Sequence, residues 1–249
     1  MNKRRFFVLL TTLILATLVF TACDLTTLQD LGTTIRGSGN VVTQEEAITG
    51  FDKLDVDQGF LVNVRQGDDF SVVIRVDDNI VEHLQVAREG DTLRIGLEPG
   101  RQYSIQEATM EADVTMPLLA GLDLNGGSHV TLSGIKSSEQ LDADLSGGSH
   151  LRGDIEAGDV KFDLSGGSDV ELSGAADNLT VDASGGSHAR LANLAVVDAN
   201  VDASGGSHAT VNPSGKLDAV ANGGSHVSYL GNPTLGTMDE DNASSIGRE

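Results

Sequence analysis

Five of the six histidines occupy the same position of a repeated sequence. Each follows a Gly-Gly-Ser triplet, and they are His129, His150, His188, His208 and His226. The one triplet without histidine carries Asp169 there. Neutral imidazole is a common transition-metal ligand and titrates near neutrality, so an outward column of these residues would offer a Zn²⁺ site or a pH sensor. Because a structural zinc site needs about four converging ligands, we favour the simpler interpretation that this position takes a small polar side chain beside a turn.

Aspartates form a second column, three positions before the first glycine of the triplet. Five of the six units have it: Asp123, Asp144, Asp163, Asp182 and Asp202, with Val220 in the sixth. Carboxylates in register suit Ca²⁺, although calcium β-rolls use a nine-residue Gly-Gly-x-Gly-x-Asp repeat and this period is about twice as long. The column therefore predicts a soluble, acidic outer face, with Ca²⁺ binding as an open alternative.

An enzymatic role finds little support in these columns. Polysaccharide lyases use similar repeated folds, and Lys161, Asp163 and Asp182 would be the residues of such a cleft. However, the same aspartate recurs in five units, and no nucleophile, base or oxyanion donor converges with it. The Gly-Gly-Ser segments precede strands and lack a phosphate-binding lysine. We therefore predict a protein that is not an enzyme and needs no cofactor.

The elements that position both columns are internal repeats. Gly-Gly-Ser begins at residues 126, 147, 166, 185, 205 and 223, a spacing of 18 to 21 residues. Apolar residues lie four and two positions before each first glycine, and the alternation resumes after the serine. Alternation on both sides of a glycine turn predicts strand, turn and strand. A repeat of about 20 residues predicts stacked units that share a core, which is an all-β parallel β-solenoid.

The predicted solenoid spans residues 37–237, with Gly-Gly-Ser rungs over 119–230 and a less regular, strand-rich part over 37–118. Gly90 and Asp91 predict a hairpin turn within that part. Residues 238–249 are acidic and leave two alternatives, a disordered tail or a last strand around 243–246 that caps the core.

The first 22 residues predict a secretory signal. A basic start, Lys3 to Arg5, precedes an apolar stretch and the small residues before Cys23, the only cysteine. This order resembles a bacterial lipobox, with Phe20 where leucine is usual, so we predict lipidation of Cys23 and a membrane-anchored tether over 23–36. An uncleaved anchor and an ordinary cleavage site are the alternatives. All three predict export, to the cell surface or the periplasm.

The amino-acid composition excludes several classes of binding partner and scaffold. Sixteen Lys and Arg stand against 37 Asp and Glu, a formal charge of −21, which excludes binding of nucleic acid at neutral pH. The absence of Trp and the two Tyr leave little material for an aromatic-lined pocket. One cysteine excludes a disulfide scaffold.

Several segments in order resemble the auto-transporter adhesin "head GIN domain" family over residues 36–247. They are Gly37–Val42, Gly50–Leu54, Gly59–Val64, Asp77–Ile80, Gly90–Ile95, Met116-Pro117, the Gly-Gly-Ser rungs and Tyr229–Pro233. The resemblance implies a right-handed parallel β-solenoid on exported, often lipid-anchored bacterial proteins, without catalytic residues. This chain departs from the family where histidine replaces the usual aspartate after Gly-Ser.

Together these features predict a lipid-anchored cell-envelope module that serves adhesion or surface interaction. Its expected partners are the membrane, through lipidated Cys23, and an envelope or extracellular molecule. The alternative is a metal-binding envelope protein that uses the histidine column.

Overall fold

The computed structural model describes residues 33–249, which form two long β-sheets and a two-stranded ribbon. The predicted signal sequence, Cys23 and most of the predicted tether lie outside the described residues. In spatial order, the ten-stranded sheet I consists of β22 (Thr234–Glu240), β20 (Lys216–Ala221), β18 (Asp198–Ala203), β16 (Asn178–Ala183), β14 (Val160–Leu164), β12 (Leu141–Leu145), β10 (Gly121–Leu124), β3 (Lys53–Val56), β7 (Thr92–Leu97) and β6 (Leu84–Glu89).

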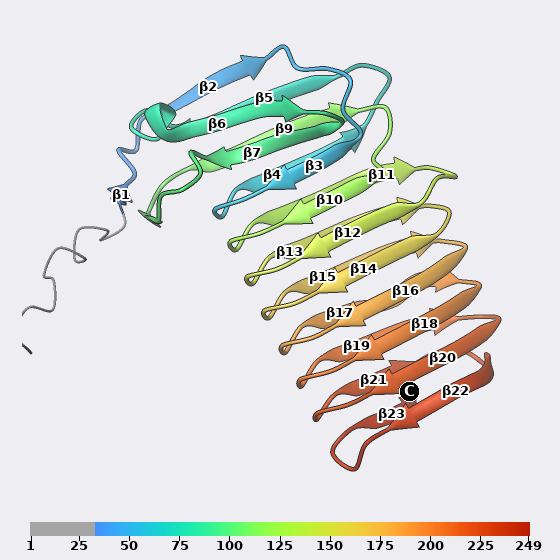
Figure 1. The fold of residues 1–249 in the computed structure, drawn as a ribbon. Coiled ribbons are helices and arrows are strands. Elements are labelled where there is room, and N and C mark those ends of the chain that lie inside the picture. Colours follow the sequence, from blue (N-terminus) through green and yellow to red (C-terminus); the bar gives the residue numbers. More distant parts are fainter. Residues whose placement is uncertain (1–32) are drawn as a thin grey trace, which may run out of the picture.

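The eleven-stranded sheet II lies against sheet I across a shared core. In spatial order it consists of β2 (Val41–Glu46), β5 (Ser71–Asp77), β9 (Met110–Met116), β4 (Leu61–Gln66), β11 (His129–Lys136), β13 (His150–Glu156), β15 (Asp169–Ala175), β17 (His188–Val196), β19 (His208–Pro213), β21 (His226–Tyr229) and β23 (Ser245–Arg248). Each of the six Gly-Gly-Ser rungs gives one strand to sheet I, turns at the triplet, and gives the next strand to sheet II (Figure 1).

Parallel pairing of equivalent strands on neighbouring rungs confirms the predicted β-solenoid. From β10 and β11 onward, every strand pairs in parallel with the equivalent strand one rung away. Inward side chains such as Leu124, Phe162 and Val201 are fully buried between the two sheets. Successive side chains of a strand point to opposite faces of the sheet, so the residues between the inward ones point outward. This alternation places both predicted columns on the surface.

The corners show why the triplet repeats. Gly205 and Gly206 have φ angles of +62° and +81°, in the left-handed region that favours glycine. A Cβ on Gly205 would lie 3.2 Å from the backbone nitrogen of Gly185 in the rung before. The serine that follows is fully buried, and its Oγ donates to a carbonyl at the start of the turn, as Ser207 does to Ser204 at 2.7 Å. The third residue of the triplet is therefore part of the core, a role that was not predicted from the sequence.

The N-terminal part departs from the predicted parallel solenoid. Strands β3 and β4 form one ordinary rung, and β7 and β9 form another. The second of these comes later in the sequence, yet it stacks on the side of the first that faces away from the Gly-Gly-Ser rungs. Strands β2 and β5 then continue sheet II antiparallel, and β6 continues sheet I antiparallel to β7. A short 3₁₀ helix, η2 (Val81–His83), precedes β6. The turn at Gly90 and Asp91 joins β6 to β7, as predicted.

Strands also form outside the predicted limits of the solenoid, at both ends of the described residues. Residues Thr33–Arg36, placed in the tether by the sequence, form β1, which pairs in parallel with β8 (Tyr103–Gln106). At the other end, β22 and β23 continue the two sheets, so residues 238–249 follow the capping alternative and the strand lies at Ser245–Arg248. No helix within residues 33–249 has the length and apolar character needed to cross a membrane.

Candidate functional site

The histidine face is the outer surface of sheet II along β11 to β21. Residues at the first position of these strands stack in register across six rungs, so the five predicted histidines and Asp169 form one column. The rings of His188 and His208 lie 5.2 Å apart and those of His208 and His226 lie 4.9 Å apart, nearly parallel. His129 and His150 stack at 4.5 Å. The outward orientation predicted from the sequence is therefore present.

This stacking does not gather the nitrogens around one point. Zn–N bonds are about 2.0–2.1 Å long, so two nitrogens on one ion lie at most about 4.2 Å apart. Parallel rings such as His208 and His226, 4.9 Å apart, would have to leave the stack to share an ion. Within residues 33–249, no group of three or more His, Cys, Asp or Glu side chains is arranged to hold a metal ion.

Asp169 interrupts the column differently from a surface aspartate. Its side chain is only 7% exposed and pairs with Arg190 on the neighbouring strand. Its Oδ1 is buried without a hydrogen-bond partner. One strand away, Arg152 lies 3.9 Å from Glu171, and both of these side chains are more than half exposed. The two arginines are thus each next to a carboxylate of the same face.

The histidines differ in their local surroundings. The Nδ1 atom of His129 lies 2.9 Å from the carbonyl oxygen of Gly127, which this nitrogen can satisfy as a donor. His150 is half-buried, and its Nδ1 has no partner. Burial, and then the neighbouring His129, hold the pKa of His150 below its usual value. Folding therefore favours the neutral imidazole at this position.

The acidic face is the outer surface of sheet I. The predicted aspartate column is present in full register, and the structure extends it by one residue, because Asp55 in β3 lies next to Asp123. We call the six residues the aspartate ladder: Asp55, Asp123, Asp144, Asp163, Asp182 and Asp202. Asp55 was not predicted from the sequence, although the run Leu54-Asp55-Val56 before Gly59 has the spacing of the later rungs.

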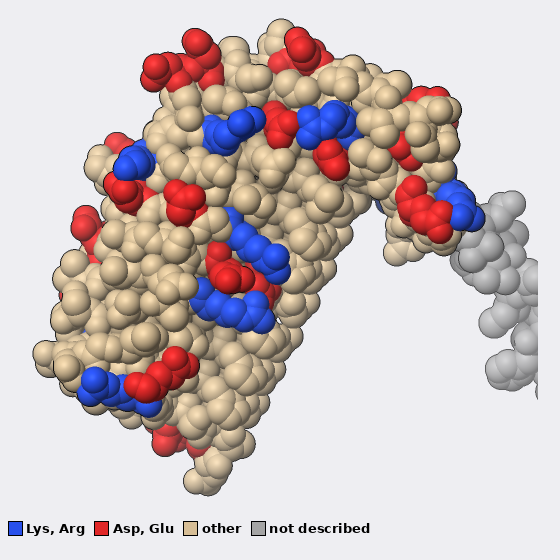
Figure 2. All heavy atoms as spheres, turned by 180° about the vertical axis from the view of Figure 1, so that it is seen from behind, with Lys and Arg blue, Asp and Glu red and all other residues tan. Residues whose placement is uncertain are grey.

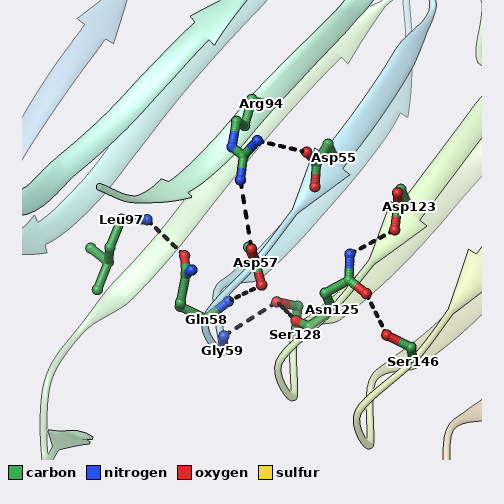
Figure 3. Close-up of polar contacts among 10 residues, drawn as sticks. All are labelled: Asp55, Asp57, Gln58, Gly59, Arg94, Leu97, Asp123, Asn125, Ser128 and Ser146. Carbon is green, nitrogen blue, oxygen red and sulfur yellow. Dashed lines mark hydrogen bonds and ion pairs between the residues drawn. The ribbon is translucent and has the colours of Figure 1, made fainter. Parts of the chain in front are cut away.

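Arg94 ends the ladder on its N-terminal side. It lies in register with Asp55, 3.6 Å from that carboxylate and 3.8 Å from Asp57 (Figure 3). At the adjacent corner, the side chain of Asn125 donates to Asp123 at 2.7 Å and accepts from Ser146 of the next rung (Figure 3). The ladder therefore has an arginine at its N-terminal end, and its interior carboxylates lie next to one another along the column.

At two positions of the ladder, Asp144 and Asp55, the surroundings disfavour the charged carboxylate. Burial raises the pKa of Asp144, and the carboxylates of Asp163 and Asp123 on either side raise it further. Burial also raises the pKa of Asp55, against the opposing effect of Arg94. The fold therefore keeps these two carboxylates on the outer face although their surroundings do not favour the charge.

A second outward column beside the ladder carries Asp142 and Asp218 against Lys161, so it adds little net charge. Over β10 to β20 the outward positions together, ladder included, carry eight aspartates against two lysines, and the face as a whole is acidic. Gly121 leaves a gap in the second column next to Lys53, where a groove of about 390 Å³ opens to solvent. Figure 2 shows the molecule from behind. On that side basic and acidic side chains lie next to one another in small groups among uncharged residues, rather than in an acidic column.

Comparison with solved structures supports the architecture. The chain is similar to a "putative adhesin" from Bacteroides fragilis, with 21% identity, a TM-score of 0.79, and coverage of 86% of this chain and 100% of that one. It is also similar to a "Putative lipid binding protein" from Parabacteroides distasonis, with 17% identity, a TM-score of 0.68, and coverage of 87% and 100%. A "putative adhesin" from Parabacteroides merdae matches with 15% identity, a TM-score of 0.61, and coverage of 87% and 99%. At these identities the likeness concerns the fold.

No curated protein matches the chain significantly. A family model does match, and it covers residues 50–233, which include all six Gly-Gly-Ser rungs and the ladder. Its description is "Putative auto-transporter adhesin, head GIN domain". The resemblance drawn from the sequence is thereby confirmed, and the chain belongs to the head GIN domain family.

Proposed function

We propose that this protein is a non-enzymatic, lipid-anchored module of the cell envelope that serves adhesion or surface interaction through its acidic face. The observation that carries the proposal is the aspartate ladder, six carboxylates in register on one flat sheet. Adjacent strands of a sheet lie about 4.8 Å apart, so the ladder presents evenly spaced charge along the length of the solenoid. A rigid array of this kind suits multivalent contact with a cationic partner surface.

The geometry argues against a catalytic use of the same carboxylates. Acid–base catalysis needs two groups with different environments that converge on one reacting atom. The ladder instead repeats one environment from rung to rung, with each carboxylate facing the same way. The family description and the names of similar structures, which refer to adhesion, also support a non-enzymatic role.

Membrane attachment through Cys23 is the second part of the proposal. It rests on the signal-like start of the sequence and on the single cysteine that follows Thr21 and Ala22. Replacement Cys23→Ser should abolish incorporation of radiolabelled palmitate and release the protein from the membrane fraction. Phe20→Leu, which brings the segment closer to the usual lipobox, is the matched control and should leave both readouts intact. Label incorporated into Cys23→Ser at the level of the native chain, or no label in the native chain, would contradict lipid anchoring.

Adhesion itself is tested with a charge-neutralised ladder. In a strain that expresses only the variant, Asp144→Asn, Asp163→Asn and Asp182→Asn together should reduce cell attachment to a polylysine-coated surface to the level of a deletion strain. A control removes three exposed carboxylates that form no side-chain hydrogen bond or ion pair in the structure and lie off the ladder: Asp68→Asn, Asp69→Asn and Asp177→Asn. Equal loss in both variants, or no effect of deletion, would contradict the proposal.

A further inference from the structure

The fixed charges of the histidine face nearly cancel. Across β11 to β21 its outer positions carry three cations, Lys136, Arg152 and Arg190, against four carboxylates, Asp154, Glu156, Asp169 and Glu171. Most are paired with one another: Arg190 with Asp169, Arg152 with Glu171, and Lys136 with Glu156 at 2.7 Å. Asp154 accepts a hydrogen bond from the backbone of Gly134. The net charge of this face is therefore set by the protonation of its five histidines.

The five imidazoles form a single straight row. They extend over six rungs, which at the spacing of adjacent strands corresponds to about 24 Å from end to end. His129, His208 and His226 are exposed, and the other two are half-buried. Asp169, the one acidic residue in the row, is buried and turned to Arg190, so its carboxylate offers little repulsion to an approaching anion. Thr131, Thr210 and Ser228 lie one column away and add hydroxyl donors.

We propose that the histidine face is an acid-activated binding site for a linear polyanion, with anionic groups repeating along an extended chain. This inference rests on the proposed surface-interaction function and identifies a second partner class for it. Above pH 7 the face is close to neutral and has no charge complementarity for a polyanion. In acid, protonated imidazoles would make the row a cationic stripe next to the column that holds Arg152 and Arg190.

The stacking makes protonation and binding depend on each other. Adjacent imidazolium rings at 4.5–5.2 Å repel, so in the free protein each proton taken up by the row opposes the next. A polyanion along the row removes this repulsion, and binding should therefore be accompanied by proton uptake. A single row of charges, rather than a broad patch, favours a linear polymer over a membrane surface.

The remaining charged groups do not prevent this contact. Beyond the N-terminal end of the row, next to Leu61, Glu111 is paired with Arg75 at 3.1 Å. Beyond the other end lies the uncharged Ser245, with Arg248 on the same strand. The acidic face belongs to the opposite sheet, about 10 Å behind, and its side chains point away from the histidine face.

The test is equilibrium binding of the full-length protein in a neutral detergent, with EDTA present, to fluorescent polygalacturonate and to polyphosphate. Both probes share the linear anionic chemistry, and comparing them distinguishes a carboxylate source from a phosphate source. Affinity for at least one should rise by about tenfold or more from pH 7.5 to pH 5.0, with proton uptake measured in two buffers of different ionisation enthalpy. Uncharged dextran should not bind at either pH.

Variants tie the effect to the row. His188→Asn, His208→Asn and His226→Asn together should remove the pH dependence, whereas His83→Asn, the histidine outside the row, should retain it. If the triple variant does not fold by circular dichroism, His208→Asn alone should reduce the affinity gain. Equal affinity of the native protein at both pH values, equal loss in His83→Asn, or binding only to anionic lipid vesicles would overturn the inference. Retained attachment to polylysine in the same preparation would show that the acidic face still functions.

Discussion

Removing one carboxylate from the interior of the aspartate ladder should stabilise the protein. Asp144 lies between Asp123 and Asp163 in register, and only Lys161 nearby opposes their effect. Two unit charges about 4.8 Å apart repel by about 0.9 kcal/mol in bulk water. Salt at 0.15 M reduces this to about half, so two neighbours together destabilise the folded state by about 1 kcal/mol. Asp144→Asn keeps the size of the side chain and removes this repulsion.

The assay is thermal or urea unfolding at pH 7.5, followed by circular dichroism, at 0.02 M and 1 M salt. We expect Asp144→Asn to raise the free energy of unfolding by about 1–1.5 kcal/mol at 0.02 M salt, where screening over this distance is weak, and the gain to shrink at 1 M salt. Asp177→Asn, which removes an exposed carboxylate from a loop, is the matched control and should have a smaller effect. A loss of stability in Asp144→Asn, or a gain independent of salt, would refute the electrostatic reasoning.

Three further predictions follow from the contacts. Gly206→Ala should lower the free energy of unfolding by about 1–2 kcal/mol, because its backbone is left-handed. Gly205→Ala should lower it by more, because its Cβ would also press on the rung before. Equal losses in unfolding experiments would contradict this. Arg190→Ala should cost about 1–3 kcal/mol, because it leaves the buried Asp169 unpaired, whereas Arg152→Ala should change stability by less than about 0.5 kcal/mol. The lowered pKa of His150 means that the unfolded chain binds its proton more readily, so this contribution to stability is full above about pH 6.5 and is lost as the pH falls. The melting temperature should therefore fall between pH 7.5 and pH 5, and His150→Asn should reduce that fall.

The repeated half of the molecule could be predicted from its sequence because every rung has the same apolar spacing and the same Gly-Gly-Ser triplet. Apolar residues two apart fix the inward face, and glycines with positive φ fix the corner, so the register of one rung gives that of the next. The histidine and aspartate columns were predicted in the same way, because each occupies an equivalent outward position in successive rungs. Asp55 was missed because its rung lacks the Gly-Gly-Ser triplet, although its local spacing is the same.

The N-terminal part could not be predicted because its strands pair out of sequence order. Alternation predicts a strand but does not say whether that strand pairs in parallel or antiparallel fashion. The antiparallel strands β2, β5 and β6 continue the two sheets at the N-terminal end, where a further parallel rung would otherwise stack. Burial of Ser207 and its equivalents was also hidden, since serine is usually a surface residue.

The central claim, that this solenoid is presented outside the cell as an interaction surface, is tested most directly by surface labelling. Ser138→Cys introduces a thiol at an exposed loop of a chain whose only other cysteine is Cys23. Intact cells are treated with a membrane-impermeant maleimide, and the native chain serves as the control. We predict labelling of Ser138→Cys in intact cells at the level reached after lysis. Labelling only after lysis would place the solenoid inside the envelope and contradict the account.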